Sequence, residues 1–255
     1  MACWGVIGGS GLDGWDDLIW TDEVVVATPY GEPSAALRLG QIEKRAQSPT
    51  KVIYLPRHGP GHCYAPHRIN YRANLWALKQ AGVQQILATA TVGSIASTIQ
   101  AGSICVPDQL IDYTWGREQS YSEDGQVLHI DFTHPFDPAL RAALIQAGQD
   151  LPSSAGFHEH GTYGCTQGPR LETAAEIVRL AKDGCSLVGM TAMPEAALAR
   201  ELGLPYALLC LAVNPAAGVG QSAAAVDHDD LKQVMSSGMH QVKAILLKTM
   251  QGKPA

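Results

Sequence analysis

Short apolar runs alternate with longer amphipathic stretches along most of the 255-residue chain. Several of these runs are apolar at consecutive positions, which is typical of strands whose two faces are both covered. The pattern predicts strands at residues 24–27, 52–55, 86–92, 104–106, 187–190 and 206–213, after a first apolar run at residues 3–7.

The stretches between the runs have helical spacing and predict helices at residues 74–81, 139–147, 172–182, 194–202 and 231–246. Pro194 and Glu195 suit a first helical turn, because proline tolerates that position and an acid complements the helix dipole. Residues 120–138 are interpreted as a long ordered loop. Alternating strands and helices predict an α/β fold, with residues 1–255 forming a single-domain three-layer sandwich in which helices flank a mixed central β-sheet.

Composition limits the partners that we expect. Apolar residues make up 46% of the chain, charged residues make up 16%, and the net charge is −6. Such a protein repels polyanions on average, so we expect no nucleic-acid partner, and a phosphate ligand has to be held by a local group of residues. No run approaches the roughly 20 apolar residues of a membrane helix, and the start lacks the basic residues of a signal peptide. We therefore expect a cytoplasmic protein with no membrane partner.

The six cysteines lie far apart without a CxxC pair, which favours reduced thiols over a disulfide framework or a zinc site. A glycine-rich turn at residues 9–14 matches the spacing GxGxxG. A dinucleotide site would also need a helix at the third glycine and an acidic residue about 20 positions on, whereas another strand-like run follows here. The turn is either a tight turn without ligand or an anion site made by backbone N–H groups and the Ser10 hydroxyl.

Two further features suit phosphate. Arg57 offers a forked contact for phosphate oxygens, and the imidazole of His58 exchanges a proton near neutral pH. The spacing of His58, His62 and His67 is also compatible with a metal cluster, but histidines in a proline-rich loop are more often solvated or hydrogen-bonded, so no metal is expected. Thr191 suits a helix cap before Pro194, a role that is compatible with contacting a ligand as well.

Several separated segments resemble one enzyme family in sequence and in order: residues 7–11 (IGGSG), 57–59 (RHG), 70–74 (NYRAN), 168–173 (GPRLET), 188–195 (VGMTAMPE) and 213–216 (VNPA). They are similar to the trimeric class of purine nucleoside and methylthioadenosine phosphorylases. The resemblance implies attack of inorganic phosphate on the anomeric carbon of a purine nucleoside, a homotrimer, and no cofactor beyond phosphate as co-substrate. The phosphate-binding residues that it implies are Ser10, Arg57, His58, Ala90, Thr91 and Thr191.

The resemblance also implies how the nucleoside is held. Glu172 and Asn214 would read the base, because a carboxylate accepts the N1 proton of a 6-oxopurine and an amide can bond both N7 and O6. The adenine-preferring branch carries aspartates at the equivalents of Asn214 and Ala216 and serine at that of Glu172, so the departures favour hypoxanthine or guanine. The implied catalytic residues are Asn214, Glu172 and His58, and the implied substrate-binding residues are Met190, Leu171, Glu172, Asn214, Ala216 and His228.

Alternatives remain open at this stage. Residues 70–79, 108–114 and 194–206 are most similar to the branch that converts S-methyl-5'-thioinosine to hypoxanthine and 5-methylthioribose 1-phosphate. A general 6-oxopurine nucleoside phosphorylase is the second hypothesis, because His228 falls near the position where that class sets a histidine against a 5'-hydroxyl. A methylthioadenosine phosphorylase and a non-catalytic nucleoside- or dinucleotide-binding protein are less favoured. The residues alone also allow Glu172 to be a helix acid, Asn214 a turn residue and Met190 a core residue.

Overall fold

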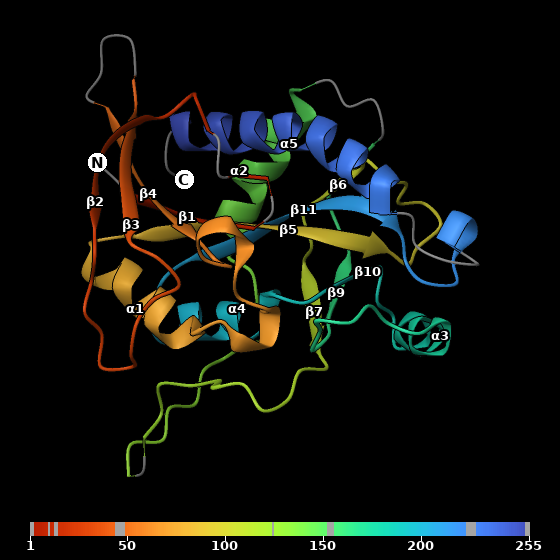
Figure 1. Cartoon of the computed structure of the whole chain (residues 1–255), viewed down its shortest axis with the longest axis horizontal. Coiled ribbons are helices and arrows are strands. Elements are labelled where there is room, and N and C mark those ends of the chain that lie inside the picture. Colours follow the sequence, from red (N-terminus) through yellow and green to blue (C-terminus); the bar gives the residue numbers. More distant parts are fainter. Residues whose placement is uncertain are drawn as a thin grey trace.

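A mixed β-sheet of 11 strands runs through the middle of the protein (Figure 1). The computed structural model describes residues 3–9, 11–12, 15–43, 49–123, 125–151, 156–222 and 228–252, apart from the side chains of residues 221 and 228–232. The strands are β1 (Cys3–Gly8), β2 (Ile19–Val24), β3 (Leu37–Ile42), β4 (Thr50–Pro56), β5 (Gln85–Ser94), β6 (Ile104–Cys105), β7 (Gln109–Asp112), β8 (Phe157–His158), β9 (Thr162–Cys165), β10 (Leu187–Gly189) and β11 (Tyr206–Pro215). Their order is β2-β3-β4-β1-β5-β10-β9-β7, while β11 pairs with β5 and β6, and β8 pairs with β6.

Helices cover both faces of the sheet. They are α1 (Tyr71–Gln80), α2 (Pro138–Gln149), α3 (Ala174–Lys182), α4 (Ala192–Glu201) and α5 (His228–Gln251), with short 3-10 turns at Pro60–His62, Pro66–Arg68 and Gly220–Ser222. Figure 1 shows α2 and α5 on one face and α1 and α4 on the other. Among the helices of the described ranges, none is long and apolar enough to cross a membrane.

Neighbouring residues of a central strand enter different hydrophobic cores. Val6 of β1 packs in the core formed with α2 and α5, whereas Ile7 packs in the core formed with α1 and α4. Leu209 and Leu208 of β11 divide in the same way. Successive side chains of a strand point to opposite faces, so this division means that the sheet is buried on both sides. Each such buried side chain stabilises the fold by about 1.5–3 kcal/mol. The predicted three-layer α/β fold with a mixed sheet is confirmed.

The central strands lie where the apolar runs predict them, but the periphery differs. The strand predicted at residues 24–27 is wrong in position, because β2 ends at Val24 and presents mostly exposed side chains. The apolar pattern does not predict β3, β7, β8 or β9, which are short or mix polar with apolar positions. In α3, Thr173 and Glu176 form a capping box that starts the helix at Ala174. Glu172 therefore lies in the preceding loop and not in the first turn.

The carboxyl ends of the central strands meet at one edge of the sheet. β1 runs parallel to β4 and β5, and β5 runs parallel to β11 along its length. Ligands gather at such an edge in α/β proteins, because several loops start there together. Near the end of β11 the register shifts between Ala212 and Asn214, so Val213 is an extra residue opposite β5. This bulge changes the direction of the strand just before Asn214.

Candidate active site

A cavity of about 260 Å³ lies at the edge where these strands end. The residues around it come from segments far apart in the sequence, namely the ends of β1, β4, β5, β10 and β11 and the loop before α3. Of the residues singled out in the sequence, the cavity is lined by Arg57, His58, Ala90, Thr91, Leu171, Glu172, Met190, Thr191, Asn214 and Ala216. Ser10 lies outside the described residues, and so does the side chain of His228 at the start of α5.

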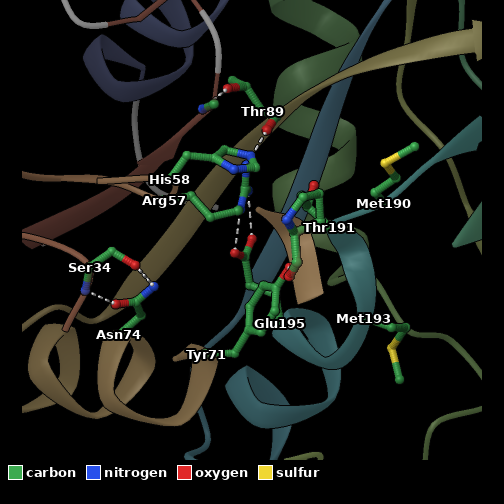
Figure 2. Close-up of polar contacts among 12 residues, drawn as sticks. Ser34, Arg57, His58, Tyr71, Asn74, Thr89, Met190, Thr191, Met193 and Glu195 are labelled. Carbon is green, nitrogen blue, oxygen red and sulfur yellow. Dashed lines mark hydrogen bonds and ion pairs between the residues drawn. The ribbon is translucent and has the colours of Figure 1, made fainter. Parts of the chain in front are cut away.

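One lining residue, Arg57, belongs to a buried ion pair. The Arg57 Nε and Nη2 groups donate to the two carboxylate oxygens of Glu195 at 2.6 and 2.7 Å, and Nη1 donates to the Thr89 carbonyl at 2.9 Å (Figure 2). Both charged side chains are almost completely buried, at 1% and 0% exposure. Burial by itself would lower the pKa of Arg57, but the Glu195 carboxylate reverses this and raises it, so the guanidinium stays charged. Glu195 is thus an anchor for Arg57.

This geometry corrects one expectation about Arg57. The fork that the sequence suggests for phosphate is occupied by Glu195, so the N–H groups left for a ligand are those of Nη1 and Nη2 that neither Glu195 nor Thr89 uses. The Nη1 side faces the glycine turn, where a Cβ built on Gly9 would lie 3.4 Å from Nη1. Glycine at this position therefore lets the main chain approach the cation closely. The Gly9 N–H donates to Thr89 Oγ1 at 3.5 Å, which ties the turn to β5.

His58 lies beside this ion pair as a neutral ring. Its Nδ1 lies 2.8 Å from the carbonyl oxygen of Tyr64, which can only accept, so Nδ1 carries the hydrogen. Burial and the neighbouring Arg57 charge lower the pKa of His58 to about 4. The ring stacks on His62, with centroids 4.0 Å apart. In a neutral ring protonated at Nδ1, the Nε2 atom presents a lone pair and can accept a hydrogen bond from a ligand.

Small residues line the cavity as well. Ala90 and Thr91 belong to the second half of β5. Thr191 follows β10 and lies beside Arg57 and Glu195 (Figure 2). The Thr191 hydroxyl makes no capping bond to α4, so its interpretation as a side-chain helix cap is wrong. The main chain at Thr191 is fixed instead by its N–H, which donates to the Tyr163 hydroxyl at 3.3 Å. Thr91 and Thr191 therefore border the same space as Arg57 and His58.

Four positions beyond Thr89 on β5, where Asn214 pairs with Gly93, the cavity is lined by a carboxylate and an amide. The Thr166 hydroxyl donates to Oε1 of Glu172 at 2.5 Å, which engages one of the two carboxylate oxygens. Asn214 follows the bulge in β11, and one N–H of its amide donates to the Pro215 carbonyl at 2.6 Å. An amide has two N–H donors and an oxygen acceptor, so one donor and the oxygen stay available to a ligand. Both side chains line the cavity together with Arg57.

Apolar side chains also line the cavity. They include Met190, Leu171 and Ala216, with Leu171 half exposed and Ala216 buried. Gly168 has φ of +61°, and a Cβ built on it would collide with the sulfur of Met190. Only glycine combines this backbone with this approach, so the loop before α3 can pack directly on the methionine.

Comparisons with known proteins give the family of this chain. The sequence matches the phosphorylase superfamily over residues 4–251. The chain belongs to this superfamily. A probable S-methyl-5'-thioinosine phosphorylase of Pseudomonas syringae is 46% identical over 98% of this chain and 99% of its own, and a probable 6-oxopurine nucleoside phosphorylase of Thermococcus kodakarensis is 39% identical over 98% and 92%. The structure is also similar to a methylthioadenosine phosphorylase of Schistosoma mansoni solved with adenine, with a TM-score of 0.89 and 32% identity over 98% of this chain and 91% of that one.

Sequence reasoning missed two residues of this phosphorylase superfamily member. Glu195 was interpreted as a first-turn acid, although a lone carboxylate in the apolar helix AMPEAALA already suggested a buried partner. Arg117, which is only 9% exposed, had no signal in the sequence, because its partners are mostly backbone carbonyls. Within the described ranges, no group of three or more His, Cys, Asp or Glu side chains is arranged to hold a metal ion.

Proposed function

We propose that this protein catalyses phosphorolysis of S-methyl-5'-thioinosine to hypoxanthine and 5-methylthioribose 1-phosphate. The observation that carries the proposal is one cavity lined by Arg57 and His58 and also by Glu172 and Asn214. Arg57 contacts Thr89 of β5, whereas Asn214 pairs with Gly93, four positions farther along that strand, so the two groups define two ends. A purine nucleoside has complementary ends, since an anionic co-substrate attacks the sugar on one side and the base departs on the other. The choice of substrate is supported by the Pseudomonas syringae relative and by Glu172 and Asn214, the proposed base-reading residues.

The first end binds phosphate. Hydrogen phosphate is held by the remaining N–H groups of Arg57, by the hydroxyls of Ser10, Thr91 and Thr191 and by the amides around Ala90. His58 accepts a hydrogen bond from the P–O–H group at Nε2, which keeps another phosphate oxygen directed at the anomeric carbon. Holding two reactants in this way supplies roughly 7–11 kcal/mol of the barrier reduction, so no covalent enzyme intermediate is required.

The second end stabilises the departing base. As the bond from the anomeric carbon to N9 breaks, its electron pair moves onto the purine, and a phosphate oxygen forms the new bond to that carbon. Asn214 donates to N7 of the purine as negative charge develops there, and Glu172 accepts the N1 proton. The proton of hydrogen phosphate ends on the base, so atoms and charge balance. Met190, Leu171 and Ala216 enclose the sugar and base, and His228 contacts the 5' group.

A general 6-oxopurine nucleoside phosphorylase is the second candidate, supported by the Thermococcus kodakarensis relative. The test is to assay methylthioinosine, inosine, guanosine and methylthioadenosine with and without phosphate and to measure the released base by absorbance. We expect turnover only with phosphate and the highest kcat/KM for methylthioinosine. Comparable values for inosine would select the second candidate, and binding without phosphate-dependent turnover would reject both.

We also propose that the chain is one domain and assembles as a homotrimer in the cytoplasm. The single domain is supported by the sheet, because the strands of one sheet contribute to both large cores. The trimer is supported by the resemblance to the trimeric phosphorylase class. The cytoplasm suits the six cysteines, which are free thiols. Light scattering on the purified protein gives the subunit number directly, and a dimeric or hexameric mass would contradict the trimer.

A further inference from the structure

Glu172, which we assign to base reading, accepts a hydrogen bond from the Thr166 hydroxyl. Glu172 borders both the nucleoside cavity and an adjoining cavity of about 410 Å³, and Thr166 lines the adjoining one. The Thr166 hydroxyl lies 2.5 Å from Oε1 of Glu172 and 3.3 Å from the Gly189 carbonyl. A hydroxyl has a single hydrogen to donate, so the shorter contact to the carboxylate prevails. Thr166 therefore acts on Glu172 from the side away from the nucleoside.

The main chain around Thr166 is held in place. Its N–H donates to the Gly189 carbonyl at 2.8 Å, and its own carbonyl accepts from Arg117 Nη2 at 3.2 Å. Arg117 binds the next residue as well, donating to the carbonyl and the side-chain oxygen of Gln167 at 2.8 and 3.1 Å. The buried guanidinium also donates to the Met190 carbonyl at 2.9 Å. Arg117 thus joins the loop before α3, at Thr166 and Gln167, to Met190 of the cavity.

We infer that Thr166 is a positioning residue that sets the preference for 6-oxopurines over adenine. The inference rests on the proposed function, because it assumes that Glu172 reads N1 of the base. A donor to one oxygen stabilises the ionised carboxylate and directs the other oxygen at the base. An ionised oxygen attracts the N1–H of hypoxanthine and repels the N1 lone pair of adenine. With Oε1 engaged by the Thr166 hydroxyl, the oxygen left for the base is an acceptor, which adenine N1 cannot bond.

The test uses Thr166→Val, which removes the hydroxyl at nearly constant shape, and Thr166→Ser, which keeps it. The measured quantity is the ratio of kcat/KM for methylthioinosine to that for methylthioadenosine. We expect the valine variant to lower this ratio about tenfold or more and the serine variant to retain it. Thr249→Val is the matched control, since Thr249 is buried, donates to the Ile245 carbonyl at 2.8 Å and belongs to α5, outside the cavity lining. Lost packing alone would lower both kcat/KM values together and leave the ratio unchanged.

Glu172→Ala separates failure of this inference from failure of the proposed function. If Glu172→Ala changes the ratio and Thr166→Val does not, the role of Thr166 is wrong while base reading by Glu172 stands. If Glu172→Ala leaves the ratio unchanged, the proposed base reading itself is wrong. In the double variant the loss caused by Thr166→Val should disappear, because its target is absent. A loss of the same size in the alanine background would overturn the inference.

Discussion

The carboxylate of Glu195 holds the guanidinium of Arg57 through two hydrogen bonds of 2.6 and 2.7 Å, across 138 positions of sequence. The Tyr206 hydroxyl donates to the same carboxylate at 2.8 Å, so helix α4 and strands β4 and β11 meet at this pair. A buried pair of this kind adds little net stability, but it fixes the direction of both charges. The proposed phosphate site and the packing of these three elements therefore share one contact.

Replacing Glu195 should lower the stability of the fold and weaken phosphate binding. In Glu195→Gln the buried Arg57 charge loses its anion, which costs about 3–5 kcal/mol of the free energy of unfolding. The guanidinium also loses its fixed direction, so we expect the KM for phosphate to rise about tenfold or more. Urea unfolding and initial rates at varied phosphate measure the two effects. Glu201→Gln, at the end of the same helix, is the control and should keep a normal KM for phosphate. A normal KM in Glu195→Gln would show that Arg57 is oriented without it.

Arg57→Lys should weaken phosphate binding selectively. Lysine keeps the charge but is a point donor without a planar fork, so it cannot bind Glu195 with two bonds and also reach the Thr89 carbonyl. We expect a rise of about 100-fold in the KM for phosphate and a much smaller change in the KM for the nucleoside. Arg179→Lys on the exposed face of α3 is the matched control. Equal changes in the two KM values would count against a phosphate role for Arg57.

The lowered pKa of His58 predicts a pH-dependent stability. The folded state holds a neutral ring down to about pH 4, whereas the unfolded chain binds the proton near pH 6.5. The unfolded state therefore binds more protons between these values, and the free energy of unfolding falls as the pH falls from 6.5 to 4, by at most roughly 3 kcal/mol. Urea unfolding of the wild type and of His58→Gln at pH 7.5 and 5 measures this. The variant should lose less stability on acidification, and an equal loss in both proteins would contradict the lowered pKa.

The central sheet was predictable because its strands are buried on both faces and appear as unbroken apolar runs. Val6 and Ile7 serve opposite cores, so neither position tolerates a polar residue. The bounds of the edge strand β2 were not predictable, because five of its six residues are exposed and form no apolar run. Pairing with β3 holds this strand in place. Local pattern carries no information about such pairing.

The candidate site was predictable in part, since its motifs resemble those of a known family. The contacts that orient the side chains were not predictable from the sequence. The pairing of Arg57 with Glu195 joins distant segments, and the bulge at Val213 depends on the register between β11 and β5. The link from Thr166 to Glu172 spans six residues of irregular loop, whose shape no periodicity encodes. These are tertiary properties.

Asn214→Asp should slow release of hypoxanthine. Aspartate keeps the shape of asparagine but replaces the donor to N7 with a negative charge, which repels the purine as it becomes anionic. Removing one such donor costs about 100-fold to 1,000-fold in kcat, so we expect a fall of this size for methylthioinosine. Activity on methylthioadenosine should fall less, because protonated aspartate can donate to N7. Single-turnover rates with both substrates measure the effect, and an equal fall for both would reject base reading by Asn214.

His228→Leu should shift the preference at the 5' end of the sugar. We propose that this histidine contacts the 5' group, and an imidazole can bond a hydroxyl, whereas leucine favours a methylthio group. The ratio of kcat/KM for methylthioinosine to that for inosine should therefore rise about tenfold, which equals about 1.4 kcal/mol. His240→Leu, an exposed position on the same helix, is the matched control and should leave the ratio unchanged. If the ratio in His228→Leu equals that of the wild type, His228 does not contact the 5' group, and the discrimination belongs to other residues around the sugar.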